Sequence, residues 1–242
     1  GQGLPLSAGL GGLSVLTLVA TPIGNLEDLP PRAERALREA DLIYAEDTRH
    51  SGRLLQRLGI EASLRSCHDY NEAQRSAEIL EHLRQGRRVA LISDAGTPGL
   101  ADPGFRVVRA AVEAGQTVSM VPGPSSVIMA LVLSGLPTDR FVYDGWLARR
   151  EGRLRRQIES WRQEERTVVA LESSHRLLKS LPVLAEVLPG RTVAVCRELT
   201  KLHEEVRRGT AAELLEHYRA KPPKGELVLV VEGGTVGPDL AP

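Results

Sequence analysis

The chain has 242 residues, of which 42% are hydrophobic and 26% are charged, as is typical of a folded globular protein with a sizeable core. Its 31 basic and 31 acidic residues balance, which excludes binding to nucleic acid by bulk positive charge but leaves room for a local basic patch. No apolar run approaches the roughly 20 residues that span a bilayer, and Cys67 and Cys196 show no CxxC or metal spacing. We therefore expect a cytoplasmic protein with reduced thiols and with neither a membrane nor DNA as a partner.

Apolar strands and amphipathic helices alternate along the chain. Residues 1–12 lack the charged and apolar segments of a signal peptide, so we interpret them as a flexible leader. Helical spacing is clearest over 29–40, where Asp28 is the expected cap, and over 71–85. The expected strands are Ser14–Ala20, Leu42–Ala45, Val89–Ser93, Thr117–Val121, Phe141–Gly145, Thr167–Glu172, Thr192–Arg197 and Glu226–Val231.

This alternation predicts an α/β fold in which helices pack on parallel or mixed sheets. The turn residues Gly135-Leu136-Pro137 end one helix before a new strand and indicate a domain boundary. We expect two α/β domains, at 13–135 and 136–233, with a cofactor cleft between them and a Gly/Pro-rich tail at 234–242.

The segment 89–104, VALISDAGTPGLADPG, is the most informative. A fully apolar strand, covered on both faces, leads into a loop of small residues, and Asp102 followed by Pro103 is expected to open the next helix. Similar loops follow other strands at 21–25 and 122–126, and α/β proteins bind ligands at such strand ends. The chain has no GxxxxGK[ST], GxGxxG after a strand, HExxH or Cys/His cluster, so we expect neither a phosphate-binding loop nor a metal.

Eight segments, covering about residues 13–233 in order, resemble the motifs of the ribosomal RNA small subunit methyltransferase I family, which belongs to the tetrapyrrole-methylase-like group. They are ATPIGNLEDL (20–29), AEDTR (45–49), HDYNE (68–72), LISDAGTPGLADPG (91–104), VPGPSS (121–126), ESSHRL (172–177), RELTKLHEE (197–205) and KGELVLVVEG (224–233). The resemblance implies a two-domain enzyme, usually a homodimer, that uses S-adenosylmethionine. It also implies methylation of the ribose 2′-hydroxyl of a cytidine in 16S rRNA, free or within the small ribosomal subunit.

Three features depart from the usual family pattern. Tyr70 stands where the family usually has a second His, and Ser174 stands where it usually has a Pro. Many members also continue into a short helical extension after the segment that ends here at Gly233. Both substituted loops are therefore expected to be tuned differently.

Small residues in two loops suit a cofactor that needs close approach to backbone donors and acceptors: Asp94, Ala95 and Gly96, and Ser125 and Ser126. By resemblance these residues carry S-adenosylmethionine, with Pro22 beside the methyl donor and the region near Glu172 on the other side. The alternative for Gly96, Pro98, Gly123 and Pro124 is ordinary turn chemistry.

The ribose hydroxyl must lose a proton during attack, so a nearby acceptor or cation is expected. We assign Asn71 and Glu72 to the substrate and Lys201 to electrostatic support. Asp47 and Arg49 are expected to orient the substrate, although such a pair is often only structural.

Arg149, Arg153 and Arg156 follow one another at spacings of four and three, which places them on one side of a helix as a candidate contact for RNA phosphates. The alternative is a solvated helix face balanced by Glu151, Glu159, Glu164 and Glu165.

Two other functions remain open from the sequence. The same fold group includes enzymes that methylate tetrapyrroles, and only the AEDTR, HDYNE and ELTKLHEE segments favour RNA. The chain could also be a catalytically silent ribosome-assembly protein that binds RNA and retains an old cofactor cleft.

Overall fold

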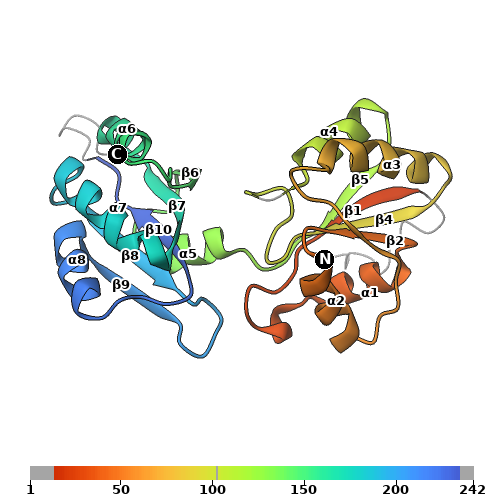
Figure 1. Ribbon diagram of the computed structural model, residues 1–242, viewed down its shortest axis with the longest axis horizontal. Helices are drawn as coiled ribbons and strands as arrows, with labels where there is room; N and C mark the ends of the chain where they lie inside the picture. Colours follow the sequence, from red (N-terminus) through yellow and green to blue (C-terminus); the bar gives the residue numbers. More distant parts are fainter. Residues whose placement is uncertain (1–13, 102, 235–242) are drawn as a thin grey trace, which may run out of the picture. The chain divides into compact units, whose positions relative to one another are not determined.

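The computed structural model describes residues 14–101 and 103–234, which form two compact units divided between Ser125 and Ser126 (Figure 1). The division comes one helix earlier than the sequence indicates. Helix α5 (Ser126–Ser134) belongs to the second unit because it packs on that unit's sheet. The expected leader at 1–12 and most of the expected tail, 235–242, lie outside the described residues.

The first unit is an α/β/α sandwich. Its described residues form a five-stranded sheet with the order β3-β2-β4-β1-β5, in which every pair of neighbours is parallel. Helices α1 and α2 cover one face of this sheet, and α3 and α4 cover the other (Figure 1). The strands are β1 (Val15–Val19), β2 (Leu42–Ala45), β3 (Leu64–Ser66), β4 (Arg88–Ile92) and β5 (Val118–Val121); the helices are η1 (Leu26–Asp28), α1 (Pro31–Glu39), α2 (Thr48–Arg57), α3 (Glu72–Arg84) and α4 (Phe105–Glu113).

Alternating side chains of the central strands fill two hydrophobic cores. On β4, Val89 and Leu91 pack on the α3 and α4 side, whereas Ala90 and Ile92 pack on the α1 and α2 side. All four are at most 2% exposed, as predicted for a strand covered on both faces.

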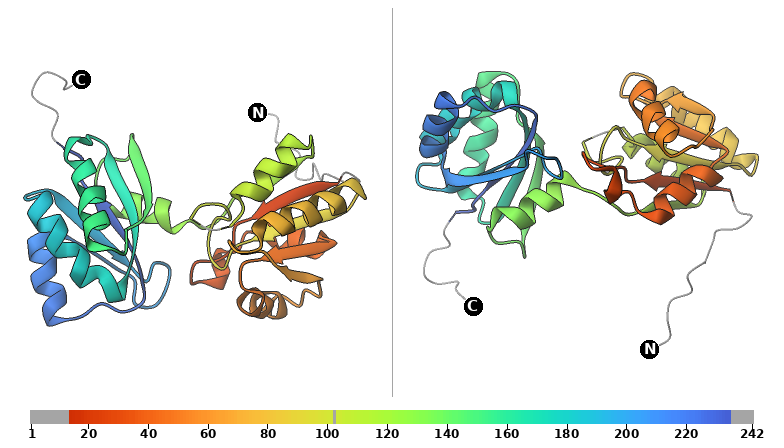
Figure 2. Two further views of the ribbon diagram at one scale, coloured as in Figure 1. Left: turned by 45° about the horizontal axis from the view of Figure 1, so that its top comes forward. Right: turned by 90° about the horizontal axis from the view of Figure 1, so that it is seen from below.

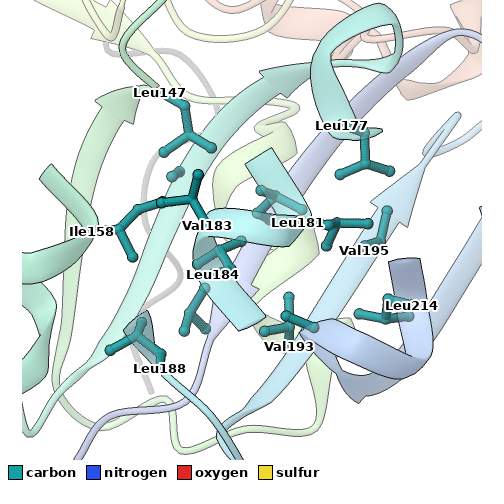
Figure 3. Packing of buried hydrophobic residues seen from close by; sticks show 14 of the residues in the cluster. Leu147, Ile158, Leu177, Leu181, Val183, Leu184, Leu188, Val193, Val195 and Leu214 are labelled. Carbon is teal, nitrogen blue, oxygen red and sulfur yellow. The ribbon is translucent and has the colours of Figure 1, made fainter. Parts of the chain in front are cut away.

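The second unit has a mixed sheet with the order β6-β7-β10-β8-β9, in which only β6 and β7 run parallel. Helices α6, α7 and α8 pack on one face and α5 on the other, as the two views of Figure 2 show. Figure 3 shows the larger core, where Leu181 and Leu184 of α7 lie over Val193 and Val195 of β8. The remaining elements are β6 (Phe141–Trp146), α6 (Glu151–Ser160), η2 (Trp161–Gln163), β7 (Thr167–Ser173), α7 (Ser174–Val187), β8 (Thr192–Arg197), β9 (Glu205–Thr210), α8 (Ala211–Ala220) and β10 (Glu226–Val231).

Most expected elements are present, with four differences. Strands β3 and β9 were not predicted, because both are sheet-edge strands with few apolar residues. Asp28 does not cap α1; it ends the 3₁₀ turn η1, and Pro30 occupies the N-cap position. Helix α4 begins at Phe105, and Asp102 lies outside the described residues.

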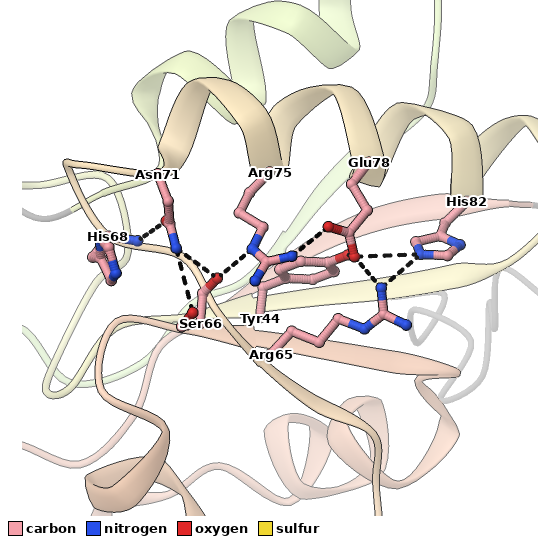
Figure 4. Close-up of polar contacts among 8 residues, drawn as sticks. All are labelled: Tyr44, Arg65, Ser66, His68, Asn71, Arg75, Glu78 and His82. Atoms are coloured by element: carbon pink, nitrogen blue, oxygen red, sulfur yellow. Dashed lines mark hydrogen bonds and ion pairs between the residues drawn. The ribbon is translucent and has the colours of Figure 1, made fainter.

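A polar network fixes α3 to the sheet (Figure 4). The Tyr44 hydroxyl donates to Glu78 at 2.7 Å, and Arg65 and Arg75 also donate to the Glu78 carboxylate. Burial opposes ionisation of Glu78, but these three donors outweigh it and lower its pKa from 4.5 to about 2. Contacts from β2, β3 and α3 therefore favour the charged carboxylate.

We predict that Glu78→Gln destabilises the protein near neutral pH and that the difference from wild type shrinks on acidification. A carboxylate with a depressed pKa contributes stability above its unfolded value, near 4.5, and loses it as pH falls toward about 2. Urea unfolding of both proteins between about pH 7 and about pH 3 measures this difference. A difference independent of pH would contradict the electrostatic role of Glu78.

Candidate active site

The candidate site is built at the carboxyl ends of the parallel strands of the first sheet. Because β4, β1 and β5 are adjacent and parallel, the loops that follow them start at the same edge. These loops contain the predicted cofactor residues Pro22, Asp94, Ala95, Gly96 and Ser125. The structure thus brings together, within one unit, residues that are up to about a hundred positions apart, at the place where parallel sheets bind ligands.

A reciprocal backbone contact joins the loops after β1 and β4. Thr21 and Gly96 exchange two N–H to carbonyl hydrogen bonds, both 3.0 Å long, and the Thr21 hydroxyl donates to the carbonyl of Ser93 at 3.3 Å. Gly96 has φ +76°, and a Cβ there would lie 3.4 Å from Ile23 Cγ2 and 3.7 Å from the carbonyl oxygen of Pro124. Three loops therefore meet around a residue with no side chain.

Gly123 marks a second close approach. A Cβ on Gly123 would lie 3.1 Å from the Cβ of Ala20 and 3.4 Å from Pro30 Cγ. The sequence placed Gly123 in a loop assigned to the cofactor, with ordinary turn chemistry as the alternative, and it did not single out Thr21. Both matter because of contacts between loops that are distant in sequence.

Asp94 extends the loop cluster to β2. Its Oδ1 accepts a hydrogen bond at 2.9 Å from the backbone N–H of Asp47, the residue that precedes α2. Asp47 Oδ1 in turn accepts from the backbone N–H of Arg49 at 2.8 Å and so caps α2. Hydrogen bonds from the Arg49 side chain and backbone lower the pKa of Asp47. The predicted pair of Asp47 and Arg49 therefore exists, with a role at the start of a helix.

The two residues assigned to the substrate, Asn71 and Glu72, lie at the start of α3. Asn71 closes a turn, because its Oδ1 accepts from the backbone N–H of His68 at 2.8 Å (Figure 4). The Glu72 side chain is only 7% exposed, and its Oε1 accepts from the backbone N–H groups of Gly104 at 2.8 Å and Arg106 at 3.1 Å. These contacts give Glu72 a structural task at α4 in place of the solvent-facing position expected of a proton acceptor.

Glu172, predicted near the cofactor, is enclosed within the second unit. Its carboxylate accepts from the backbone N–H of Ser173 at 2.8 Å and from the Ser180 hydroxyl, and Arg176 Nη1 lies 3.5 Å away. The side chain has no exposed surface, so it organises the start of α7. Ser126, another predicted cofactor residue, is the first residue of α5.

Lys201 lies between β8 and β9 of the second unit. Its Nζ is 3.1 Å from Glu198 Oε1 and 3.0 Å from Glu226 Oε2. Burial opposes the charge, but the two carboxylates more than compensate and raise the pKa of Lys201. The ammonium predicted to support catalysis is therefore charged and already paired within its own unit.

The candidate basic stripe is present but is not wholly helical. Arg149 precedes α6, whereas Arg153 and Arg156 lie on the exposed side of that helix. Among residues 14–101 and 103–234, none of the three forms a salt bridge, whereas Arg155 pairs with Glu186 at 2.6 Å. Three guanidinium groups are thus free of acidic partners within the described part of the chain.

Comparison with known proteins identifies the family of this chain. Residues 15–215 match the model of the tetrapyrrole (corrin/porphyrin) methylases. A ribosomal RNA small subunit methyltransferase I from Synechocystis is 46% identical over 92% of this chain and 80% of its own length. The protein of that name from Thermotoga maritima is 43% identical over 90% of this chain and 98% of its own length.

Solved structures show the same fold. Uroporphyrin-III-C-methyltransferase from Thermus thermophilus superimposes with a TM-score of 0.64 at 24% identity, covering 90% of this chain and 94% of its own. Diphthine synthase gives a TM-score of 0.70 at 16% identity, covering 93% and 92%. No helix in the described part of the chain has the length and apolar character needed to cross a membrane. The chain therefore belongs to the tetrapyrrole methylase family and, within it, to the ribosomal RNA small subunit methyltransferase I enzymes.

Proposed function

We propose that this methyltransferase transfers a methyl group from S-adenosylmethionine to the ribose 2′-hydroxyl of a cytidine in the 16S rRNA of the small ribosomal subunit. The meeting of three strand-end loops around Gly96 carries the proposal, together with relatives named as small subunit rRNA methyltransferases. The silent alternative is not favoured, because the loop cluster retains the small residues that a cofactor needs.

The loops around Gly96 fit the proposed cofactor. S-adenosylmethionine has an amino-acid end and an adenosine end, which require hydrogen-bond donors and acceptors, and Ala95 is an exposed residue of this loop. Pro22, Asp94, Ala95 and Gly96 would hold the cofactor together with Ser125 and Ser126. Glu172 is left out of this set because its carboxylate is enclosed and bonded within its own unit.

The chemistry depends mainly on positioning. When bound, the cofactor supplies an electrophilic methyl group on a cationic sulfur. The ribose oxygen would take that methyl group, the electrons of the broken sulfur–carbon bond would stay on sulfur, and the hydroxyl proton would pass to an acceptor. The protein must align oxygen, carbon and sulfur and admit a proton acceptor, which can be water. Asn71 would orient the substrate through the turn that it closes.

We also propose that the enzyme is a cytoplasmic homodimer. Helix α5 is apolar on more than its buried side, and Ile128 and Val132 are 48% and 63% exposed. Apolar helix faces of this kind are commonly covered by a partner, here a second copy. Light scattering would give twice the chain's mass if this is right and the mass of one chain if it is wrong.

The direct test is methyl transfer to small ribosomal subunits from cells that lack the enzyme, with labelled S-adenosylmethionine. Label in an alkali-resistant dinucleotide that contains cytidine supports the proposal. Cofactor binding without transfer to subunits or to free 16S rRNA would refute it and favour a tetrapyrrole or another small acceptor. Absence of cofactor binding would favour the silent RNA-binding alternative.

We predict that Gly96→Ala weakens S-adenosylmethionine binding by about tenfold or more, because alanine is strained at φ +76° and relief of that strain would shift the loop at the point where three loops meet. Gly86→Ala is the matched control: Gly86 has φ +80° with open space around it and lies before β4, at the opposite end of that strand. Both variants should lose similar stability in thermal unfolding. Equal affinity in the two variants, measured by calorimetry, would contradict the assignment of Gly96.

We predict that the double variant Arg153→Glu/Arg156→Glu binds small subunit rRNA more weakly and with a smaller salt dependence. Each lost phosphate contact should reduce the slope of log K against log salt by about 0.7 to 0.9. The control is Arg84→Glu/Arg109→Glu, which makes the same change in net charge at exposed positions of the first unit. If both double variants behave alike, α6 does not contact RNA.

A further inference from the structure

The loop after β4 is fixed at both of its ends. Near β4, Gly96 is bound to Thr21, and Asp94 accepts from Asp47. At the far end the loop folds back on itself, because the N–H of Gly99 donates to the carbonyl of Pro103 at 3.2 Å. A Cβ on Gly104 would lie 3.0 Å from the Cα of Gly99, so this return is tightly packed.

The far end of the loop leads into α4. The residue at the N-cap position of α4 makes no side-chain hydrogen bond to the first turn of that helix. Gly104 occupies the N-cap position and has no side chain to offer. Unpaired N–H groups at the start of a helix cost free energy when they are buried. Here Glu72, 32 positions earlier in the chain, accepts from two of them, on Gly104 and Arg106.

Glu72 is suited to this role because it lies at the starts of two helices. It is the first residue of α3, and its own N–H donates to the carbonyl of His68 at 2.9 Å. A carboxylate is stabilised near helix N-termini by the helix dipole, and these contacts offset the burial of its charge. Arg106 Nε, 3.9 Å from Glu72 Oε2, adds a weak ion pair.

We propose that Glu72 is a positioning residue that fixes the far end of the Ser93–Gly104 loop and so pre-forms the cofactor site, without accepting the substrate proton. This inference rests on the proposed function, since it assumes that the loop binds S-adenosylmethionine. Glu72 directly follows the His68–Asn71 turn, so the same side chain connects that turn, assigned to the substrate, with the cofactor loop. It thereby sets the spacing between the two.

The variants Glu72→Gln and Glu72→Ala test this role. Glutamine keeps a carbonyl oxygen that can accept from Gly104 and Arg106, whereas alanine removes both bonds. We expect Glu72→Gln to keep the Kd for S-adenosylmethionine and kcat within about threefold of wild type, and Glu72→Ala to raise that Kd by about tenfold or more. At saturating cofactor, kcat of the alanine variant should largely recover, because no proton acceptor has been lost.

A catalytic base behaves in the opposite way. If Glu72 accepts the proton, Glu72→Gln should lower kcat by about a hundredfold or more, should remove the acidic limb of the pH profile and should leave the Kd unchanged. That result overturns the proposal even if the alanine variant does not fold. Equal cofactor affinity in wild type and a folded Glu72→Ala also overturns it.

Glu78→Ala on the same helix is the control for general destabilisation. Glu78 bonds to Tyr44, Arg65 and Arg75 and not to the cofactor loop. The Glu78→Ala variant should be less stable than wild type but should bind S-adenosylmethionine with an unchanged Kd. Failure of wild type to bind the cofactor in calorimetry would instead refute the proposed function, so the two failures are distinguishable.

Discussion

The reciprocal hydrogen bonds between Thr21 and Gly96 are the constraint on which the candidate site depends. They join, through backbone atoms, the loops that leave the adjacent inner strands β1 and β4 of the first sheet. The parallel order β4-β1-β5 brings these loops to one edge, and the left-handed backbone of Gly96 lets the loop after β5 approach as well. Asp94 then connects the cluster to α2 through Asp47. The result is a set of pre-ordered backbone groups, which suits a reaction that depends on alignment.

Much of the fold follows from local sequence patterns. Apolar runs predicted Leu42–Ala45, Thr192–Arg197 and Glu226–Val231 with the same bounds as the structure, because buried strands consist almost entirely of β-branched and aliphatic residues. Strands β3 and β9 lie at sheet edges, where polar residues are tolerated, so LRS and EVRRGT carry no such pattern. The domain boundary expected after Gly135 lies one helix later than the division in the structure, because only packing shows on which sheet α5 lies.

The sequence predicted which loops form the candidate site, but not the hydrogen-bond and ion-pair partners of the residues in it. Asp94, Ala95 and Gly96 were expected at a strand end and are found there, since strand and loop are contiguous in sequence. The contacts of Glu72 with Gly104 and of Lys201 with Glu226 join residues 32 and 25 positions apart, and no periodicity encodes them. These contacts change the interpretation of both residues, because a group that already has buried or charged partners is less free to meet a substrate. Charged and polar residues in a motif therefore indicate where a site lies more reliably than they indicate what each residue does in it.

The central claim is that the strand-end loops of the first unit hold the methyl donor. A crystal structure of the enzyme with S-adenosylhomocysteine, the product left after transfer, tests it most directly. The account predicts hydrogen bonds from the ligand to backbone groups of 94–96 and 122–125, with Gly96 unchanged in conformation. A ligand bound elsewhere, with those loops making no contact to it, would contradict the account.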